Sequence, residues 1–404
     1  MQKTICELFA GVGGFRLGFD RLSSGWETTW FSQWDPKRKS QDAHECYIRH
    51  FGDCTDLRGE YHTNEDITTM DKDQIPDHTL LVGGFPSQDY TVAKPLSTAQ
   101  GITGTKGTLW WQVRDILAVK RPAFCLLENV DRLLQSPKGQ RGRDFGLILG
   151  TFAEYGYQVE WRVVNAAQYG GAQRRKSTFI FAYRKDTAYA AKMQFANAED
   201  VILTDGFMAQ AFPVMSMDKL ADIQLDGTLT DISDNFTFDF QSAGYMCDRH
   251  VSTAKVKEIE EAPILLGDVL EASADRKYYI PANMLPRWEY LKGAKKIPRV
   301  AKTGFEYFYT EGAMAFPDTL DKPSRTLAAS EGKVDRGTHV VADPITGELR
   351  KLTPVEMERL QGFDDNWTAG MTEPMRRFCM GNALVVPMVT RMGAVLDTIV
   401  ANEP

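Results

Sequence analysis

The segment Phe9-Ala10-Gly11-Val12-Gly13-Gly14 has residue types suited to binding a nucleotide-like cofactor. Glycines let the backbone turn tightly, so that a ligand can approach the main chain between a strand and the following helix. The spacing is not that of the dinucleotide fingerprint G-x-G-x-x-G, because Arg16 stands where the third glycine would follow Gly11 and Gly13. The turn therefore favours the adenosyl cofactor of a methyltransferase over a nicotinamide or a flavin.

Two further segments supply side chains that can hold an adenosine. Trp34 and Asp35 fall near the end of the expected second strand, where an aromatic ring can stack on adenine and a carboxylate can reach ribose hydroxyls. Asp66 and Ile67 are expected at the third strand, in a position suited to the adenine amino group. Each residue taken alone is more often a core or turn residue. Their order and spacing after the glycine turn favour a cofactor site.

The elements that must position these residues alternate between strands and helices in the first part of the chain. Apolar runs bounded by turn residues predict strands, and longer apolar segments predict helices. The expected strands are Thr4 to Phe9, Leu80 to Val82, Phe124 to Leu127, Val159 to Val164 and Thr178 to Tyr183, and the expected helices are Phe15 to Leu22, Leu109 to Val119 and Phe145 to Tyr155. Such alternation predicts an α/β fold with a doubly wound, mostly parallel sheet and helices on both faces.

A different pattern begins after residue 185. From 186 to about 322, short apolar pieces are separated by Asp, Gly, Ser and Pro without a clear helical period, which predicts a second, smaller and irregular domain. Regular structure returns at Thr353, which can cap a helix with Pro354 at its first position and Glu356 in a capping box. An apolar helix from Val385 to Val400 is expected at the end of the chain.

Composition sets outer limits on the function. The 404 residues with 43% hydrophobic content suffice for a large core and a second domain, and no run approaches about 18 consecutive apolar residues, so a soluble, cytoplasmic protein is expected. Six cysteines without a C-x-x-C pair argue against disulfides and structural zinc, and no metal site is expected. The net charge of −7 opposes nucleic-acid binding unless local basic clusters, such as 173–176, 138–143 and 292–302, provide it.

The segment Gly84-Phe85-Pro86-Ser87-Gln88 closely resembles the Gly-Phe-Pro-Cys-Gln motif of DNA cytosine-5 methyltransferases. The family's other motifs appear in the same order. Phe9 to Gly14 resembles the cofactor loop, Gly107-Thr108-Leu109 the segment flanking the catalytic loop, Glu128-Asn129-Val130 the Glu-Asn-Val motif, Gln173-x-Arg175 the Gln-x-Arg-x-Arg motif, and Gly381-Asn382 the carboxyl-terminal Gly-Asn. The resemblance covers about residues 4–184 and 323–395, and the unmatched region between them is where the family has its variable target-recognition region.

The resemblance implies methyl transfer to carbon 5 of a cytosine flipped out of double-stranded DNA. Carbon 5 is too poor a nucleophile to accept a methyl group unaided, so a nucleophile at position 87 would first add to carbon 6. Glu128 would hold or deliver the proton at N3, and Arg175 would stabilise the flipped base or its phosphate. The cofactor would be S-adenosylmethionine, with S-adenosylhomocysteine as product.

The resemblance also assigns residues to binding. The expected cofactor pocket consists of Phe9, Gly11, Gly13, Gly14, Trp34, Asp35, Asp66, Ile67, Pro86, Leu109 and Asn382. The expected DNA contacts are Gln88, Gln173, Arg174, Lys292, Lys295, Lys296, Arg299, Lys333 and Arg336. Residues 1–185, completed by about 378–404, are expected to form a Rossmann-like catalytic domain, and 186–377 the small domain, with target recognition at about 186–325.

Three positions depart from the family's pattern. Ser87 stands in place of the cysteine, and a serine hydroxyl is a far weaker acid than a thiol with a pKa of about 8.5. We therefore expect cofactor and DNA binding with little or no methyl transfer, as in a variant engineered to hold a complex. Gln33 stands where the family often has an acid, which leaves Asp35 as the expected ribose partner. Ser177 replaces the second arginine of Gln-x-Arg-x-Arg, so one contact to the base is missing or supplied from elsewhere.

Other functions remain open at this point. A catalytically silent DNA-binding or regulatory homologue is distinguished by whether Ser87→Cys restores methyl transfer. An RNA cytosine-5 methyltransferase is distinguished by competition between duplex DNA and transfer RNA, and the long variable region favours DNA. A nicotinamide oxidoreductase is disfavoured by the absent third glycine. The favoured function is the modification half of a bacterial restriction-modification system, acting as a monomer on the same site as a restriction endonuclease.

Overall fold

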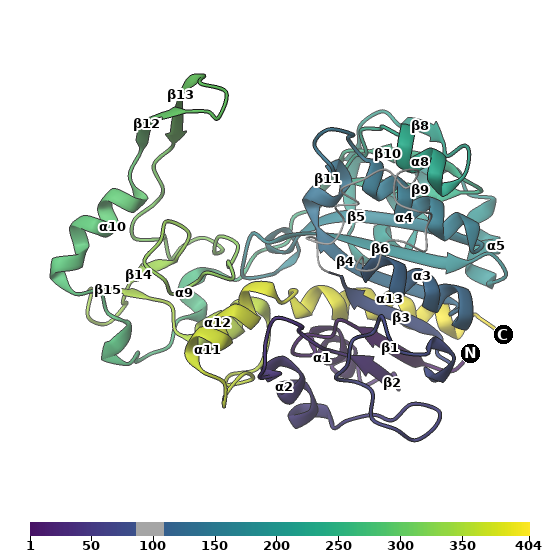
Figure 1. Ribbon diagram of the computed structural model, residues 1–404, viewed down its shortest axis with the longest axis horizontal. Helices are drawn as coiled ribbons and strands as arrows, with labels where there is room; N and C mark the ends of the chain where they lie inside the picture. The colour runs from purple at the N-terminus through teal and green to yellow at the C-terminus, as the bar shows by residue number, and fades with distance from the viewer. Residues whose placement is uncertain (86–108) are drawn as a thin grey trace. The chain divides into compact units, whose positions relative to one another are not determined.

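The computed structural model describes residues 1–85 and 109–404, which separate into two compact units (Figure 1). Unit 1 consists of Met1–Tyr169, Lys176–Glu261 and Leu384–Pro404, and unit 2 of Gly170–Arg175 and Ala262–Ala383. The predicted site residues Pro86, Ser87 and Gln88 lie outside the described residues, as do Gly107 and Thr108.

A nine-stranded sheet forms the centre of unit 1. Its order is β2 (Glu27–Ser32), β1 (Thr4–Leu8), β3 (Leu80–Gly84), β4 (Phe124–Val130), β6 (Lys176–Arg184), β5 (Tyr157–Asn165), β9 (Ala243–Cys247), β10 (His250–Ala254) and β8 (Ala221–Gln224). The first four strands pair in parallel and the others join antiparallel. The central parallel strands are apolar along their length because both of their faces are covered; Leu80 to Val82 and Phe124 to Leu127 are fully buried.

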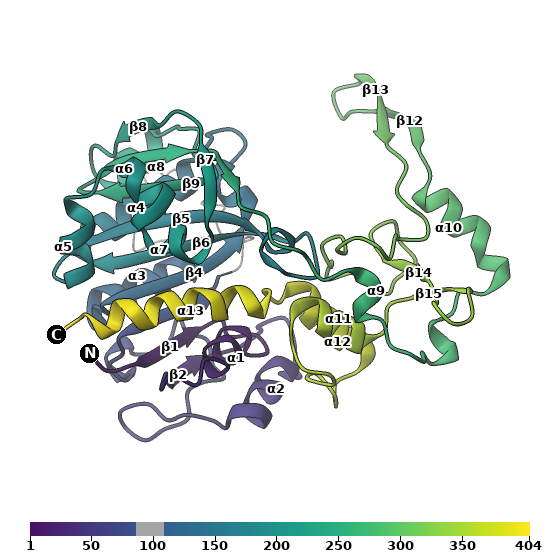
Figure 2. The same ribbon diagram turned by 180° about the vertical axis from the view of Figure 1, so that it is seen from behind.

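Helices cover both faces of this sheet. The helices of unit 1 are α1 (Gly14–Asp20), α2 (Asp42–Phe51), α3 (Leu109–Lys120), α4 (Arg143–Glu154), α5 (Ala188–Gln194), α6 (Ala198–Asp200), α7 (Phe207–Ala211), α8 (Leu229–Asn235) and α13 (Val386–Ala401). Helices α3 and α4 face the viewer in Figure 1, and α7 and α13 face the viewer in Figure 2. A short antiparallel pair, β7 (Val214–Met217) with β11 (Val256–Glu258), completes the unit.

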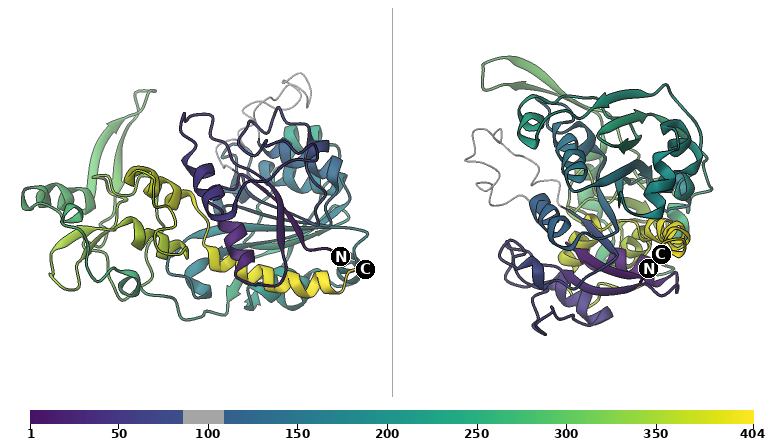
Figure 3. Two further views of the ribbon diagram at one scale, coloured as in Figure 1. Left: turned by 90° about the horizontal axis from the view of Figure 1, so that it is seen from below. Right: turned by 90° about the vertical axis from the view of Figure 1, so that its right-hand side faces the viewer.

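Helix α13 brings the end of the chain against its beginning. It packs closely on α1, because a Cβ on Gly18 would come within 2.6 Å of Val389 and one on Gly393 within 2.5 Å of Leu22. The ammonium of Lys3 lies 2.7 Å from the carboxylate of Asp397, and the two termini lie side by side in Figure 3.

The helices of the described residues differ from membrane-spanning helices in length and composition. None of them alone is long and apolar enough to cross a bilayer, and only α12 (Glu373–Asn382) and α13 taken together as a bent pair meet the criteria of length and composition. The apolar residues of α13, among them Val389 and Leu396, are buried in the core of unit 1, which accounts for its composition.

Unit 2 is built from short elements. Its helices and strands are α9 (Leu266–Val269), α10 (Leu285–Lys292), β12 (Lys295–Val300), β13 (Glu306–Glu311), β14 (Val340–Ala342), β15 (Leu349–Lys351), α11 (Pro354–Gln361) and α12. The capping box at the start of α11 is confirmed: Thr353 N donates to Glu356 Oε2 at 2.9 Å, and Glu356 N donates to Thr353 Oγ1 at 3.2 Å. Glu356 also accepts from the buried guanidinium of Arg350 at 2.8 Å.

The α/β fold class is confirmed, and three details differ from the expectations. The sheet is mixed, with its parallel part limited to β2, β1, β3 and β4. Residues 186–261, expected in the small domain, belong to unit 1 because β9, β10 and β8 continue the main sheet beyond β5. Asp66 and Ile67, expected at a strand, lie in turns before the 3-10 helix η1 (Lys72–Gln74).

Candidate functional site

The glycine turn follows β1 in unit 1 and has the left-handed backbone that glycine permits. Gly11 and Gly13 have φ of 56° and 89°, and Phe9 adopts φ of 54° despite its side chain. A Cβ on Gly13 would lie 2.5 Å from the ring of Phe51, so only glycine fits there. A Cβ on Gly11 would meet no described atom within 4 Å. The turn is therefore closely packed at Gly13, and the space next to Gly11 is open among the described residues.

The end of β2 supports this turn through a side chain that the sequence analysis set aside. Gln33 Oε1 accepts a hydrogen bond from Gly11 N at 2.6 Å, so Gln33 fixes the turn at the position where the family often has an acid. Trp34 is 38% exposed. Asp35 accepts from the backbone N of Lys37 at 2.9 Å and lies 3.3 Å from Arg38, which leaves part of its carboxylate at the surface.

The other expected cofactor residues of unit 1 lie in different settings. Asp66 caps a turn by accepting from Thr68 N at 2.9 Å, and Ile67 is 5% exposed, with its carbonyl bound by the ammonium of Lys72. Leu109 begins α3 and packs against the main core. Nothing in these contacts directs Ile67 toward a ligand.

Glu128 lies near the carboxyl end of β4, beside the last residue of β3. Gly84 pairs with Glu128 in the sheet, and a Cβ on Gly84 would lie 3.4 Å from Glu128 Oε2, so the glycine leaves room beside the carboxylate. On the other side, the buried Ser177 of β6 donates from Oγ to Glu128 Oε1 at 2.6 Å. Ser177 thus occupies the position of the family's second arginine and contacts the carboxylate proposed for catalysis.

Asn129 anchors the backbone that leads toward position 87. Its Nδ2 donates to Phe85 O at 2.6 Å, and its Oδ1 accepts from Val130 N at 2.8 Å. The ring of Phe85 is 4% exposed and lies 5.5 Å from that of Trp110, so the last described residue before 86–108 is held on two sides. The Glu-Asn-Val motif alone did not indicate this contact of Asn129.

Glu7 is a buried acid that the sequence analysis missed. It lies on β1, two residues before Phe9, and its Oε2 accepts from the hydroxyl of Tyr47 at 2.8 Å. Burial raises the pKa of Glu7 to about 7, and Glu7 Oε1 has no hydrogen-bond partner among residues 1–85 and 109–404. A single acid inside the apolar run Thr4 to Leu8 was the signal that could have found it.

Gln173 and Arg175 belong to unit 2. Gln173 is fully buried; its amide donates to Leu360 O at 3.0 Å and to Gln361 Oε1 at 2.8 Å, and it accepts from Leu327 N at 3.1 Å. The Gln173 side chain therefore holds residues 170–175 in place within unit 2. Its burial argues against the predicted DNA contact. Arg174 is exposed.

Arg175 is joined to the Gly-Asn motif within the same unit. Its Nη1 donates to Gly381 O at 3.1 Å. A Cβ on Gly381 would lie 2.5 Å from the backbone of Ala328, so the close approach requires glycine. Asn382 is exposed at the end of α12 and donates to Phe378 O at 3.0 Å.

Comparison with known proteins shows the family to which the chain is similar. Residues 3–397 match the model of the family described as C-5 cytosine-specific DNA methylase. The chain belongs to this family. Type II methyltransferase M.Sau3AI of Staphylococcus aureus is 43% identical over 401 residues, covering 98% of this chain and 95% of that protein. Type II methyltransferase M.SsoII of Shigella sonnei is 26% identical over 383 residues, covering 95% and 77%.

Solved structures bear on the fold of this chain. The Entamoeba histolytica methyltransferase EhMeth superimposes with a TM-score of 0.59 at 15% identity, covering 98% of each chain. The Dnmt2 methyltransferase of S. pombe gives a TM-score of 0.59 at 14% identity, covering 99% of this chain and 100% of that one. At these identities the likeness concerns the fold alone, and it agrees with the α/β architecture of unit 1.

The basic residues of unit 2 that were predicted to contact DNA differ in their exposure. Lys292 is 1% exposed, and its ammonium donates to Thr338 O and to Arg336 O; burial lowers the pKa of Lys292 to about 8. That burial argues against the predicted phosphate contact. Lys295 and Arg336 bind nearby carbonyls, whereas the predicted DNA contacts Lys296, Arg299 and Lys333 are exposed.

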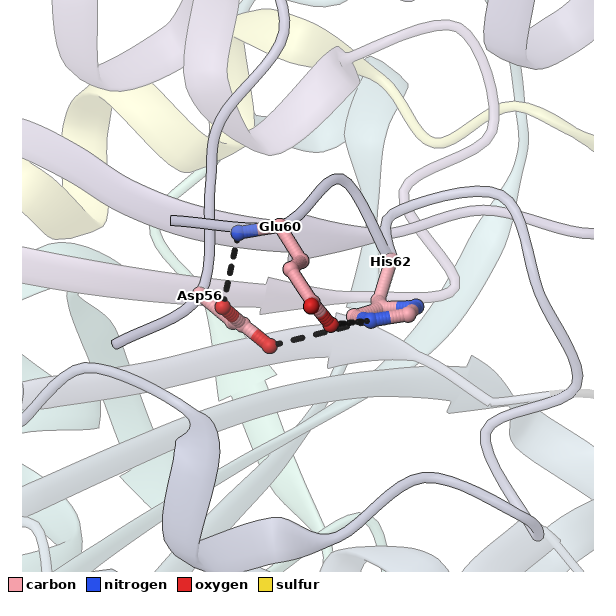
Figure 4. A group of neighbouring side chains, drawn as sticks. All are labelled: Asp56, Glu60 and His62. Carbon is pink, nitrogen blue, oxygen red and sulfur yellow. Dashed lines mark hydrogen bonds and ion pairs between the residues drawn. The ribbon is translucent and has the colours of Figure 1, made fainter. Parts of the chain in front are cut away.

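One cluster in unit 1 has metal-ligand residue types: Asp56, Glu60 and His62 (Figure 4). His62 Nε2 lies 2.9 Å from Glu60 and His62 Nδ1 lies 2.9 Å from Glu65, and these hydrogen bonds raise the pKa of His62. Asp56 Oδ1 accepts from Glu60 N at 3.0 Å. Both ring nitrogens of His62 thus lie within hydrogen-bond distance of carboxylates.

Proposed function

We propose that this chain is the modification methyltransferase of a type II restriction-modification system, acting on carbon 5 of cytosine in double-stranded DNA. One geometric observation carries the proposal. The glycine turn follows the carboxyl end of β1, Phe85 follows that of β3 two residues before Ser87, and Glu128 lies near that of β4; these are neighbouring parallel strands. Ligands of open α/β sheets bind outside these ends. The names of two relatives, both type II methyltransferases, support the assignment to a restriction-modification system.

The residues around the glycine turn fit S-adenosylmethionine. The space above Gly11 is open, and the exposed ring of Trp34 and the partly exposed carboxylate of Asp35 follow the adjacent strand. Trp34 would stack on the adenine and Asp35 would accept from the ribose hydroxyls. Bound there, the cofactor supplies an activated methyl group. The same proposal extends to Phe9, Gly13, Gly14, Asp66, Ile67, Pro86, Leu109 and Asn382.

The chain's own groups would prepare the cytosine. Glu128, fixed by Ser177, would hold or deliver the proton at N3 of a flipped base. Arg175, fixed by Gly381, would stabilise the base or its phosphate through its donor fork. Ser87 takes the place of the nucleophile, and its hydroxyl ionises too weakly to add readily to carbon 6. The chain should therefore bind DNA and cofactor while transferring methyl groups slowly or not at all.

Transfer of a labelled methyl group from S-adenosylmethionine to duplex DNA tests this function, with the unmodified chain and Ser87→Cys compared side by side. Ser87→Cys should methylate duplex DNA and the unmodified chain should not, while both bind S-adenosylhomocysteine. When duplex DNA and transfer RNA are offered together to Ser87→Cys, the labelled methyl group should appear in the duplex DNA and not in the transfer RNA. Preferential methylation of transfer RNA would show that the substrate is RNA and not DNA.

A catalytically silent DNA-binding protein is a second candidate, favoured by two serines at catalytic positions. Ser87 stands in place of the cysteine and Ser177 in place of an arginine. If Ser87→Cys remains inactive while the double variant Ser87→Cys with Ser177→Arg methylates DNA, the chain has lost two catalytic groups and the silent role is supported. If Ser87→Cys alone methylates DNA, an arginine at position 177 is not required for catalysis, and the silent role is contradicted.

A further inference from the structure

Eight of the twelve strand residues in the β12-β13 hairpin of unit 2 are exposed. Lys295 pairs with Glu311 at its base and Val300 with Glu306 at its tip, and Figures 1 and 2 show it extending beyond α10. Val300 is 66% exposed and Phe305 in the tip loop is 69% exposed. An isolated two-stranded hairpin is only marginally stable in water, so exposed apolar side chains on it indicate a surface that acts by contact.

The base of the hairpin is held firmly. The ammonium of Lys295 donates to Leu291 O at 3.0 Å and lies 3.0 Å from Glu311. The guanidinium of Arg336 donates to Leu291 O at 2.8 Å and to Gly293 O at 3.1 Å, and it lies 3.3 Å from Glu311. These cations brace the hairpin where it joins the rest of unit 2.

The cations of β12 nearer the tip lie on aromatic rings. Lys296 Nζ is 4.5 Å from the ring of Phe308, and the guanidinium of Arg299 is 4.1 Å from the ring of Tyr309. Both side chains are exposed, as is Lys302 in the tip loop. Residues 295–305 contain three lysines and one arginine and no acidic residue, although the whole chain has a net charge of −7.

We propose that the β12-β13 hairpin enters the major groove of duplex DNA tip first, with Arg299 and Phe305 reading base edges and Lys296 contacting a phosphate. The inference rests on the proposed function, because duplex DNA is the substrate. The major groove is about 12 Å wide and admits a two-stranded ribbon, and its depth of about 8.5 Å equals two to three strand residues at about 3.3 Å each. Local positive charge complements the phosphates at its rim.

This geometry gives each side chain a distinct task. Arg299 is one residue from the end of β12, so it reaches the level of the bases, where its fork fits the O6 and N7 atoms of guanine. Phe305 presents an apolar ring to thymine methyl groups. Lys296 lies three residues further from the tip, about 10 Å along the strand, which is the level of the phosphates. Stacking on Tyr309 limits the orientations that Arg299 adopts before binding.

Selection from a random-sequence duplex library, with S-adenosylhomocysteine present, tests the hairpin. The unmodified chain should enrich one sequence and protect a guanine N7 in that duplex from dimethyl sulfate. Arg299→Lys keeps the charge and loses the fork, so affinity for the selected duplex should fall roughly tenfold to a hundredfold and the N7 protection should vanish, while non-specific binding is unchanged. Phe305→Ser should relax the preference at a thymine.

Lys296→Ala tests whether Lys296 contacts a phosphate and not a base edge. It should weaken binding to all duplexes alike and reduce the slope of log affinity against log salt by about 1, leaving the enriched sequence unchanged. Lys192→Ala, which removes an exposed lysine from α5, should have no effect. Melting temperature and S-adenosylhomocysteine binding confirm that each variant is folded. If Arg299→Lys and Phe305→Ser keep both the enriched sequence and the N7 protection, the hairpin inference is overturned; if the unmodified chain binds no duplex, the proposed function fails.

Discussion

Ser177 donates a hydrogen bond to Glu128 across adjacent strands of the central sheet, with 2.6 Å between Oγ and Oε1. A serine replaces an arginine here, and the short hydroxyl reaches the carboxylate only because β6 runs directly beside β4. The pair fixes one oxygen of Glu128, while Gly84 leaves space beside the other. The missing arginine is thus replaced by a different, shorter donor.

Removing that donor should impair catalysis in an active background. In Ser87→Cys, the further change Ser177→Ala should lower kcat roughly tenfold to a hundredfold with little change in KM, because a hydrogen bond to a charged group contributes about 1.5–3 kcal/mol. Ser177→Thr should restore most of the rate because it retains the hydroxyl. Steady-state methylation kinetics measure kcat and KM for the two variants. Ser216→Ala, at an exposed serine of β7, is the matched control; equal rates for Ser177→Ala and the control would contradict the positioning role.

Ser87→Cys should raise methyl transfer on the order of a thousandfold or more over the unmodified chain, because a thiolate attacks where a hydroxyl does not. Its rate should increase with pH toward the thiol pKa of about 8.5, and a thiol-alkylating reagent should abolish it. The unmodified chain treated with the same reagent serves as the control. Comparable rates in the two proteins would show that position 87 does not carry the nucleophile.

Glu7 should make folding stability depend on pH. Burial raises its folded-state pKa from 4.5 to about 7, so the folded chain binds more protons than the unfolded chain between these values, and stability decreases as pH rises from about 4.5 to about 7. The contribution is about 3 kcal/mol at most. Glu7→Gln should remove this dependence, whereas the exposed Glu27→Gln should leave it. Urea unfolding at pH 5 and pH 8 measures the difference, and an unchanged pH dependence in Glu7→Gln would refute the assignment.

The two glycines of the turn should respond differently to alanine. Gly13→Ala combines an unfavourable φ with a Cβ 2.5 Å from Phe51, so it should lower the free energy of unfolding by roughly 2–4 kcal/mol. Gly11→Ala meets only the unfavourable φ and should cost about 1 kcal/mol. The added methyl group of Gly11→Ala points into the open space that the cofactor is proposed to occupy. S-adenosylhomocysteine binding should therefore be lost although the chain stays folded. Titration calorimetry with thermal melting separates the two effects; tight binding by Gly11→Ala would place the cofactor elsewhere.

Local patterns were sufficient for much of the fold. The apolar runs of β1, β3 and β4, the capping box at Thr353 and the glycine turn all lie where the sequence indicates, because each depends on residues within a few positions of one another. The strand expected at Asp66 is absent from the structure, since neighbouring polar residues form turns there. The extension of the sheet by β9, β10 and β8 depends on pairing with the distant β5, which no local pattern records.

By itself, the sequence determined the family motifs, their order and the identity of Ser87 and Ser177, because these are properties of residue type and spacing. Only the tertiary structure decided which partner each side chain meets. Gln33 binds Gly11, Ser177 binds Glu128, and Lys292 is buried whereas Arg299 is exposed. The physical reason is that hydrogen bonding and burial depend on distance in space, and packing brings together residues that the chain separates by tens of positions.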